Sequence, residues 1–458
     1  SPRSRQQLES KKPHSLAVGF FFAGTSSRMM KLHPDTLAQL LSLRDSAEGV
    51  STDTRSPLED KMFIALRGKN FDGNAFVKSA LEQGASHAVT SSRQWIGTDN
   101  VTVVEDELGA MQALARAYRR RWDCPVLAMT GSNGKTTTKE LIRDVLFARF
   151  EVHATLGNLN NHIGVPLTLL NAPAKPRFVI VEMGANHRQE IELLATISEP
   201  NHGYITNIGL AHLAGFGGEE GVYLGKKELF DHLAKHDGTA FVQQGDDKVV
   251  RASQGVASCI DVPTPKWSWT TRPGGGGYAT RNDKSIEVNL EGRYNLANVV
   301  AAVTIGEHFG VAWEDVRNAI STYVPSNHRS QSMSTENNWV ILDAYNANPS
   351  SMNLALFDFQ ERRHAAPLAI LGDMAELGDA SAEAHQKVAH NCLSRGVELW
   401  SVGPSFGDIF TSNPEESWTH FDSIDHLTVH LRKNPIRGRQ ILLKGSRSAA
   451  LERLLPYL

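Results

Sequence analysis

The stretch CPVLAMTGSNGKTTTKE, residues 124–140, constrains the fold most strongly. An uncharged apolar run leads into Gly131-Ser132-Asn133-Gly134, and Lys135 then opens a segment typical of a helix. A glycine-rich turn between a buried strand and a helix surrounds an anion with backbone N–H groups and the positive end of the helix dipole. A strict phosphate-binding loop would carry glycine where this chain has Met129, but the loop from Gly131 onward can still hold phosphates. The pattern predicts a nucleotide site, and a turn that binds nothing is the alternative.

Bulk properties narrow the class of protein. A chain of 458 residues is long enough for about three domains. Its formal net charge of -3 provides no basic excess for general nucleic-acid binding. Cys124, Cys259 and Cys392 lie far apart, which fits neither a disulfide framework nor a zinc site and favours a reducing cytoplasm. No apolar run reaches the roughly 20 residues that cross a membrane, so no membrane insertion is expected.

The strand and helix patterns predict an α/β protein of three domains. Residues 1–28 precede Met29-Met30 and are expected to be a non-native or disordered extension. Residues 29–121 should form a small α/β domain that ends near Trp122, after a helix pattern with a basic last turn. Residues 122–325 alternate buried strands with helices, which predicts a mostly parallel sheet around the phosphate loop. Residues 326–458 repeat strand, turn and helix, as in a Rossmann-like domain.

One turn-rich stretch stands out within the second predicted domain. Residues 263–283 contain four consecutive glycines between two groups of polar residues. Such a composition is typical of connections between regular elements. We therefore expect a loop without structure of its own.

Other side chains with chemical potential follow the next predicted strands. Glu182 ends the run VIVE, and ligands bind at the carboxyl ends of strands in open parallel sheets. Its carboxylate suits Mg²⁺, as does the Thr136 hydroxyl beside Lys135, and an exposed strand-end glutamate is the alternative. His212, after the following strand, is equally consistent with a structural role. These groups alone do not distinguish a hydrolase, a kinase and a ligase.

Eight motifs in fixed order resemble the ATP-dependent Mur ligases of peptidoglycan synthesis. They are TGSNGKTTTKE, TLGNLNNHIGVPLTLL, VIVEMGANH, TNIGLAHLAGFG, GRYNLANVVAAV, LDAYNANPSSM, LGDMAELG and LLKGSRSAALE. The resemblance runs from about Leu32 to the last residue, and it is most similar to the branch that joins D-alanyl-D-alanine to UDP-N-acetylmuramoyl-tripeptide. It implies a monomeric bacterial ligase that uses ATP and two Mg²⁺ ions. In this family ATP phosphorylates the peptide carboxylate, and the amine of the incoming group then attacks the acyl phosphate.

The resemblance also implies roles for individual residues around ATP. Lys135 would contact the phosphates, and Lys226 would be carried as a carbamate, although the adjacent Lys227 leaves the register open. Arg329 lies in PSNHRSQ, where many relatives have Pro-Gly-Arg, and for Asn295 and Asn298 two helix-start caps are the alternative. The implied metal ligands are Thr136, Glu182, His212 and Lys226. The implied ATP-binding residues are Gly131, Ser132, Asn133, Gly134, Lys135, Thr136, Thr137, Asn295, Asn298, Arg329 and Asp343.

Substrate-binding residues implied by the resemblance are spread over all three predicted domains. The first domain would hold the UDP end of the substrate, and the alternative is that its polar residues form a plain surface loop. A loop at 157–166 would hold the sugar-peptide part. In the last domain Lys444, Ser446 and Arg447 precede a predicted helix, an arrangement that suits an anion. The spread implies domain closure around the substrates. The full set is Thr52, Asp53, Arg55, Lys69, Asn70, Asp72, Gly73, Asn158, Asn160, Asn161, Tyr345, Asn346, Lys444, Ser446 and Arg447.

Four alternative functions deserve comparison. The Mur ligase that adds the third, diamino-acid residue typically carries Asp-Asn-Pro-Arg, which this chain lacks. Folylpolyglutamate synthetase shares the scaffold without this set of loops. A nonenzymatic nucleotide-dependent scaffold need not retain Lys135, Glu182, His212 and Lys226 together. A simple ATPase would release phosphate without either peptide substrate, and the third residue of the tripeptide, lysine or a diaminopimelate, stays open.

Overall fold

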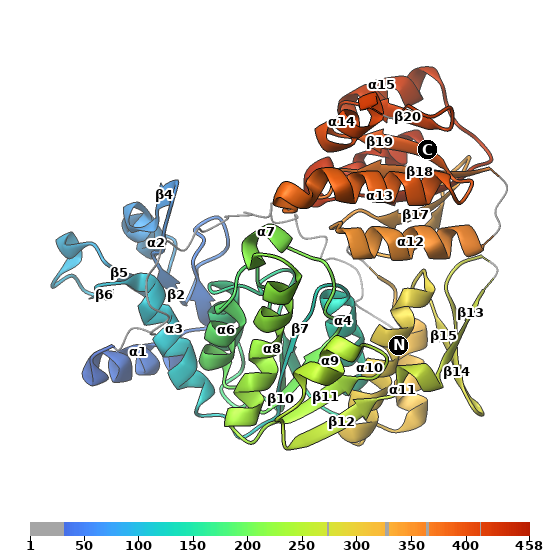
Figure 1. Ribbon diagram of the computed structural model, residues 1–458. Coiled ribbons are helices and arrows are strands. Elements are labelled where there is room, and N and C mark those ends of the chain that lie inside the picture. Colours follow the sequence, from blue (N-terminus) through green and yellow to red (C-terminus); the bar gives the residue numbers. More distant parts are fainter. Residues whose placement is uncertain (1–31, 273, 326–328, 363–365, 413) are drawn as a thin grey trace, which may run out of the picture.

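The computed structural model contains three α/β lobes in chain order (Figure 1). It describes residues 32–272, 274–325, 329–362, 366–412 and 414–458. The extension predicted at residues 1–28 lies outside these ranges. So do Asn327 and His328, where the sequence departs from the Pro-Gly-Arg of many relatives. Sheets dominated by parallel strands occur in each lobe, which confirms the predicted fold class. The predicted domain boundaries stay predictions.

The first lobe is built on a small parallel sheet in the order β1-β2-β5-β6. A short hairpin of β3 (Arg67–Gly68) and β4 (Phe71–Asp72) extends beyond the sheet. The remaining elements are β1 (Gly49–Ser51), β2 (Lys61–Ile64), β5 (His87–Thr90), β6 (Val101–Val103), α1 (Pro34–Ser46), α2 (Val77–Glu82) and α3 (Glu107–Arg119).

Helix α3 joins the first lobe to the central one. Asp106 caps its start by accepting a hydrogen bond from Leu108 N, and apolar residues at helical spacing give it a buried face. Tyr118 Oη donates a hydrogen bond of 3.2 Å to Ala172 O in the central lobe. One hydrophobic core therefore runs from the first sheet through α3 to the central sheet.

The central lobe contains a six-stranded parallel sheet in the order β12-β11-β10-β7-β9-β8. The apolar run before Gly131, the run VIVE and the strand before His212 are confirmed as the adjacent strands β7, β9 and β10. Met129 is fully buried inside β7, so the phosphate loop begins at Gly131 and needs no glycine at 129. The strands are β7 (Val126–Thr130), β8 (Val152–Ala154), β9 (Phe178–Glu182), β10 (His202–Ile205), β11 (Thr239–Gln243) and β12 (Ser258–Val262).

Helices cover both faces of the central sheet because alternate strand residues enter different cores. In β7, Val126 and Ala128 pack into one core, whereas Leu127 and Met129 pack into the other. The first face is covered by α5 (Gly164–Leu170), α6 (Glu190–Ser198), α8 (Glu219–Lys235) and α9 (Asp247–Ala252), with α7 (Leu213–Phe216) beside α8. The second is covered by α4 (Lys135–Leu146), α10 (Leu296–His308) and α11 (Trp313–Thr322).

The prediction of an unstructured loop at 263–283 is wrong. The stretch forms most of an antiparallel sheet made of β13 (Ser268–Thr271), β14 (Gly277–Arg281) and β15 (Lys284–Val288). Trp267 and Trp269, two residues apart, both pack against the second core. Gly274, Gly275 and Gly276, all with positive φ, form the turn between β13 and β14. The glycines therefore shape a hairpin instead of interrupting structure.

The last lobe is a second doubly wound sheet in the order β16-β17-β21-β18-β19-β20, antiparallel only at β16. Its strands are β16 (Gln331–Ser334), β17 (Trp339–Asp343), β18 (Pro367–Gly372), β19 (Glu398–Val402), β20 (Trp418–Phe421) and β21 (Gln440–Lys444). One face packs against α12 (Pro349–Glu361), α13 (Ser381–Leu393) and α14 (Pro404–Ser412), and the other against α15 (Ile424–Lys433).

The helix predicted after Arg447 is not an α-helix. Two 3-10 segments follow β21, Arg447–Ala449 and Leu451–Tyr457, separated by Ala450 in a left-handed conformation. Pro456 within the second segment also disfavours an α-helix. The predicted helix N-terminus beside Ser446 and Arg447 is therefore absent from the described residues.

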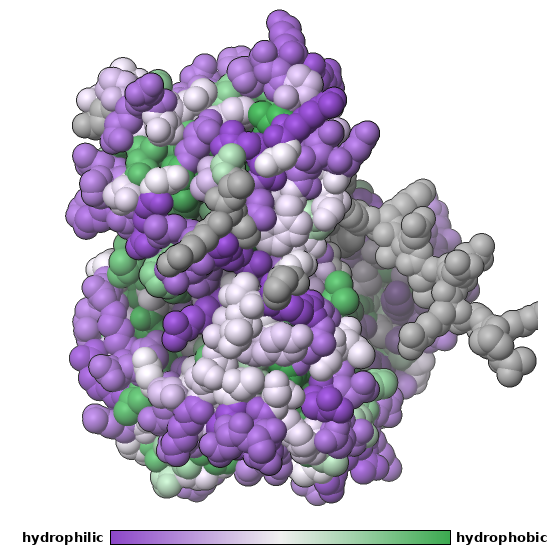
Figure 2. Space-filling model, turned by 90° about the vertical axis from the view of Figure 1, so that its right-hand side faces the viewer, coloured by the Kyte–Doolittle hydropathy of each residue, from purple (hydrophilic) through white to green (hydrophobic). Residues whose placement is uncertain are grey.

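The surface contrasts with these cores. The face in Figure 2 is mostly hydrophilic, and hydrophobic residues lie on it in small groups. Within the ranges that the structure describes, no helix is long and apolar enough to cross a bilayer.

Candidate active site

The loop between β7 and α4 has the backbone geometry of an anion site. Gly131 (φ 146°) and Gly134 (φ 78°) adopt conformations that favour glycine. A Cβ on Gly134 would lie 2.6 Å from Asn298 Oδ1, and one on Gly131 would collide with Thr206. The loop leads into the twelve-residue helix α4, whose N-terminus begins at Lys135. These residues fit a phosphate group.

A segment after β10 holds this loop in place. Asn207 is the main partner, because its Oδ1 accepts from Asn133 N at 3.0 Å and its Nδ2 donates to Asn133 O at 2.9 Å. Ser132 Oγ donates to Gly209 O at 2.9 Å. These hydrogen bonds hold the loop in the conformation seen in the structure. No role could be assigned to Asn207 from the sequence, although it closely follows the strand before His212.

Lys135 is a half-buried cation that folds back over the loop. Its Nζ donates a hydrogen bond of 2.6 Å to Gly131 O. Burial lowers the pKa of Lys135 to about 8, although Glu182 acts in the opposite direction. An ammonium in this position can balance a phosphate charge.

Glu182 ends β9 and is almost completely buried, which rules out the exposed-glutamate alternative. Its Oε1 accepts from Asn160 Nδ2 at 2.8 Å and from Thr136 Oγ1 at 3.2 Å. Its Oε2 accepts no hydrogen bond from a described residue. Burial raises the pKa of Glu182, but the cations Lys139, Lys135 and Arg329 outweigh it and hold this pKa below the ordinary value. A carboxylate with one oxygen that accepts no hydrogen bond from a described residue, beside a hydroxyl, fits Mg²⁺.

Sequence reasoning missed Lys139, one helical turn after Lys135. Its buried Nζ lies 3.4 Å from Glu182 Oε2 and 3.4 Å from Gly157 O. The signal was available, because a lysine at i+4 shares the helix face of Lys135. Lys139 links the carboxylate of β9 to the loop that precedes α5.

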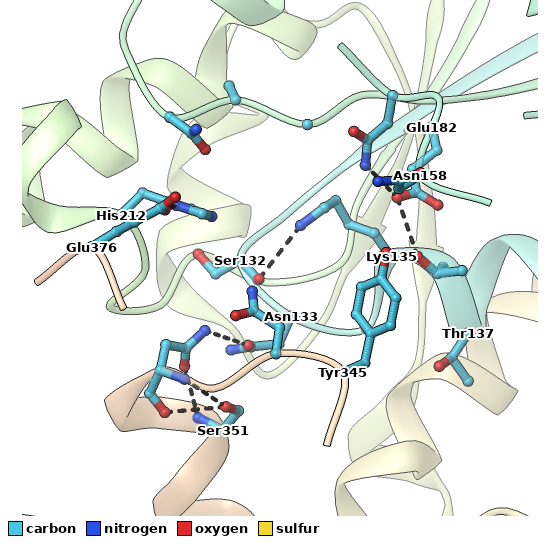
Figure 3. Close-up of a pocket in the computed structure, with 18 of the residues that line it drawn as sticks. Ser132, Asn133, Lys135, Thr137, Asn158, Glu182, His212, Tyr345, Ser351 and Glu376 are labelled. Carbon is cyan, nitrogen blue, oxygen red and sulfur yellow. Dashed lines mark hydrogen bonds and ion pairs between the residues drawn. The ribbon is translucent and has the colours of Figure 1, made fainter. Parts of the chain in front are cut away.

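A cavity of about 720 Å³ lies between the central and last lobes. Figure 3 shows Lys135, Glu182 and Tyr345 around it. It brings together residues predicted from segments far apart in the chain. Those that line it are Ser132, Asn133, Gly134, Lys135, Thr136, Thr137, Asn158, Asn160, Asn161, Glu182, His212, Asn295, Asn298, Arg329, Asp343, Tyr345, Asn346 and Lys444.

The two asparagines near α10 do not act as caps. Asn295 stands at the N-cap of α10, but its side chain makes no capping hydrogen bond. Instead, Asn298 Nδ2 donates to Asn295 Oδ1 at 2.7 Å, and Thr138 Oγ1 donates to Asn298 Oδ1 at 2.9 Å. The pair therefore ties α10 to α4 at the cavity wall.

The last lobe supplies charged and aromatic groups to the cavity. The Arg329 guanidinium stacks over Tyr345, 3.7 Å from the ring centroid. Lys444 forms an ion pair with Asp343. Asn161, on the opposite wall, accepts from Gly164 N at 2.8 Å and so also orients α5.

His212 and Glu182 belong to different parts of the cavity. The His212 imidazole contacts Glu376 of the last lobe through Nδ1, and Figure 3 shows this pair away from Glu182. The hydrogen bond from His212 is the main reason that the pKa of Glu376 is lowered. Among the residues that the structure describes, no three His, Cys, Asp or Glu side chains are grouped to hold a metal. The metal role of His212 stays a prediction.

Lys226 and Lys227 have opposite environments in α8. Lys226 is buried, its Nζ lies 5.2 Å from the Phe216 ring centroid, and it does not line the cavity. Burial, and secondarily Lys135, lower the pKa of Lys226 to about 7. Lys227 is partly exposed and pairs with Asp231.

The predicted UDP-binding residues lie apart from the cavity, in the first lobe. Arg55 pairs with Asp53 at 2.7 Å, and this hydrogen bond is the main reason that the pKa of Asp53 is lowered. Asp72 accepts from Asn74 N at 3.0 Å, so it shapes the turn after β4. Predicted residues that do not line the cavity are Thr52, Asp53, Arg55, Lys69, Asn70, Asp72, Gly73, Gly131, Lys226, Ser446 and Arg447.

Comparisons with known proteins agree with this arrangement. The family model of the Mur ligase middle domain matches residues 129–306, and that of the Mur ligase, glutamate ligase domain matches residues 328–447. The UDP-N-acetylmuramoyl-tripeptide--D-alanyl-D-alanine ligase of Bacillus subtilis (strain 168) is 32% identical over 94% of this chain and 97% of its own.

The chain belongs to the Mur ligase family. Structural comparison of this Mur ligase gives the same result. MurF from Acinetobacter baumannii superimposes with a TM-score of 0.78 and 26% identity, over 90% of this chain and 97% of the other. MurF from Thermotoga maritima, solved in complex with ADP, shares the fold with a TM-score of 0.78 at 24% identity, over 91% and 97% of the two chains.

Proposed function

We propose that this Mur ligase joins D-alanyl-D-alanine to the C-terminal carboxylate of UDP-N-acetylmuramoyl-tripeptide at the expense of ATP. The γ-phosphoryl group would pass to the carboxylate, giving an acyl phosphate and ADP. The dipeptide amine would then attack the acyl carbon, so that the new amide bond forms while phosphate leaves and a proton is released. The relatives named for this reaction support it, since they match the chain over most of its length.

One observation supports this reaction most directly. Lys135 and Glu182 lie on one cavity wall, and Arg329 and Lys444 of the last lobe lie on the same cavity. Several cations around one space suit a step in which a carboxylate must approach a triphosphate. Closure of the two lobes around this cavity would also limit access of water, which would hydrolyse an acyl phosphate.

The residues fit Mg²⁺, which would neutralise phosphate charge when bound. Thr136 and Glu182 offer a hydroxyl and a carboxylate oxygen that accepts no hydrogen bond from a described residue. Two ions are proposed, with His212 as a further ligand.

Lys226 is proposed as the carbamoylated residue. Only a neutral amine reacts with CO₂, and a pKa of about 7 leaves much of Lys226 neutral near physiological pH. Its burial and the ion pair of Lys227 with Asp231 favour Lys226 over its neighbour. The loss of two protons and the gain of CO₂ would convert a cation into an anionic oxygen ligand.

The first lobe is proposed to hold the UDP end, through Arg55 and the β3–β4 hairpin. Cys124, Cys259 and Cys392 are all free thiols, in keeping with the reducing bacterial cytoplasm that we propose as its location. The chain is proposed to act as a monomer.

Competition between amines tests the choice of acceptor. The protein receives ATP, Mg²⁺ and UDP-N-acetylmuramoyl-tripeptide with equal amounts of D-alanyl-D-alanine, L-alanyl-L-alanine and a free diamino acid. Mass spectrometry should show only the D-alanyl-D-alanine product. A second reaction supplies UDP-N-acetylmuramoyl-dipeptide in place of the tripeptide, and incorporation of the diamino acid there would instead assign the chain to the sister ligase.

A further inference from the structure

The N-terminus of α12 reaches across from the last lobe to the phosphate loop. Asn348 Nδ2 donates a hydrogen bond of 2.7 Å to Asn133 Oδ1. Next to it, Ser350 Oγ accepts a hydrogen bond of 3.1 Å from Leu210 N. Leu210 follows Gly209, which itself holds the phosphate loop. Both hydrogen bonds therefore join the start of α12 to the phosphate loop or to the segment that holds this loop.

The helix cap fixes the orientation of the Asn348 amide. Asn348 Oδ1 accepts from Ser351 N at 2.9 Å, and Ser351 Oγ accepts from Asn348 N at 3.1 Å, which forms a capping box. Because the cap occupies Oδ1, the Nδ2 donor turns toward Asn133. The side chain is also buried, with 7% of the residue exposed. The donor is therefore held in place by its own helix.

The acceptor is held just as firmly. Asn207 binds both the N–H and the C=O of Asn133, and Thr206 Oγ1 donates to Asn133 O at 2.6 Å. The Asn133 backbone therefore cannot move without breaking several hydrogen bonds, and its side chain points from the loop to α12. Figure 3 shows Asn133 between the phosphate loop and the start of α12, next to Ser351.

We propose that Asn133 and Asn348 form a positioning pair that couples the occupancy of the phosphate loop to the position of the last lobe. The proposal rests on the proposed function, in which this loop holds ATP and the last lobe closes the cavity. When the loop is arranged around phosphate, Asn133 Oδ1 can accept the hydrogen bond from Asn348 at the start of α12. Because α12 belongs to the last lobe, this hydrogen bond holds the lobe against the loop. Docking and nucleotide binding then favour each other by reciprocal coupling.

The coupling has a size that experiments can resolve. A buried hydrogen bond contributes about 0.5–1.5 kcal/mol. At 1.4 kcal/mol per factor of ten, the docking equilibrium should shift up to about tenfold when the pair is broken. Both residues line the cavity, and the proposed effect on catalysis acts through the lobe position.

Three variants separate coupling from helix stability. Asn348→Asp keeps a good N-cap acceptor for Ser351 but removes the N–H donor and places a carboxylate opposite Asn133 Oδ1. Asn133→Ala removes the acceptor. Ser351→Ala is the matched control, because it breaks the capping box on the same helix without touching the loop. Melting temperatures report any loss of folding.

The readout is the separation of two dyes as ADP and Mg²⁺ are added. One dye sits on exposed Cys259 of the central lobe, and the other on Ser412→Cys of the last lobe, in a chain with Cys124→Ser. The wild type and Ser351→Ala should show an ADP-dependent change in energy transfer. Asn348→Asp and Asn133→Ala should each lower the equilibrium constant for docking of the last lobe, obtained from this change, up to about tenfold. The double variant should lower this constant no further than either single variant does.

Two results would overturn the coupling: no ADP-dependent change in the wild type, or losses that multiply in the double variant. The assay is independent of peptide products. A wild type that moves with ADP but makes no ligated product would therefore refute the proposed function and leave the coupling intact.

Discussion

Lys226→Met should make the protein more stable and less active at the same time. In a CO₂-depleted buffer the buried amine has a pKa of about 7, against 10.5 for an ordinary lysine. Between these values the unfolded chain binds a proton that the folded chain does not, so stability falls as pH falls from 10.5 toward 7. The folded protein therefore loses at most about 4 kcal/mol to this lysine at pH 7 and about 2 kcal/mol at pH 9.

Methionine has a similar length and carries no charge, so it should recover part of that loss. We expect urea unfolding to give Lys226→Met a higher free energy of unfolding than the wild type, by a margin that shrinks by about 2 kcal/mol between pH 7 and pH 9. Ligation should fall at least about 100-fold, because the proposed anionic ligand is lost.

Lys227→Met is the matched control. Its ion pair with Asp231 is partly exposed, so we expect a change of under about 1 kcal/mol and normal activity. A Lys226→Met protein that is less stable at pH 7 would refute the burial argument. Loss of ligation in Lys227→Met, but not in Lys226→Met, would move the carbamate to the neighbouring lysine.

Three further predictions concern the cavity and the core. Lys135→Ala should lower kcat about 10²–10³-fold with an unchanged circular dichroism spectrum, and retained turnover would contradict the phosphate-loop assignment. Glu182→Gln keeps the side-chain shape but removes the charge, so calorimetry should show ADP binding that no longer responds to Mg²⁺; an unaltered response would exclude Glu182 as a ligand. Burial lowers the pKa of His202 and of His232 to about 4. Below pH 6.5 only the unfolded chain gains these protons, so stability should fall toward pH 4 by up to about 3 kcal/mol per histidine. His202→Phe should flatten this dependence in urea unfolding, and an unchanged slope would contradict it.

The sequence was most informative where chemistry follows the end of a buried strand. The glycines after β7 and Glu182 after β9 could be placed at one sheet edge, because parallel strands carry their carboxyl ends together. Even Met129, which breaks the usual motif, is explained by its place inside β7. Local spacing and strand order were sufficient for these residues.

Contacts between lobes could not be predicted in this way. Asn133 and Asn348 are 215 positions apart, and His212 and Glu376 are 164 apart, so their pairing depends on how two folded lobes dock. Neither local propensity nor hydrophobic period encodes that docking. At residues 263–283 the glycine count misled the prediction, because the alternation of Trp267 and Trp269 into the core outweighs it.

The most direct test of the central claim is phosphate release from ATP and Mg²⁺, measured with each peptide substrate alone and with both together. A ligase of the proposed kind should release phosphate in steady state only when UDP-N-acetylmuramoyl-tripeptide and D-alanyl-D-alanine are both present, with one pentapeptide product for each phosphate. Release that needs neither substrate would make the chain a plain ATPase and contradict the account.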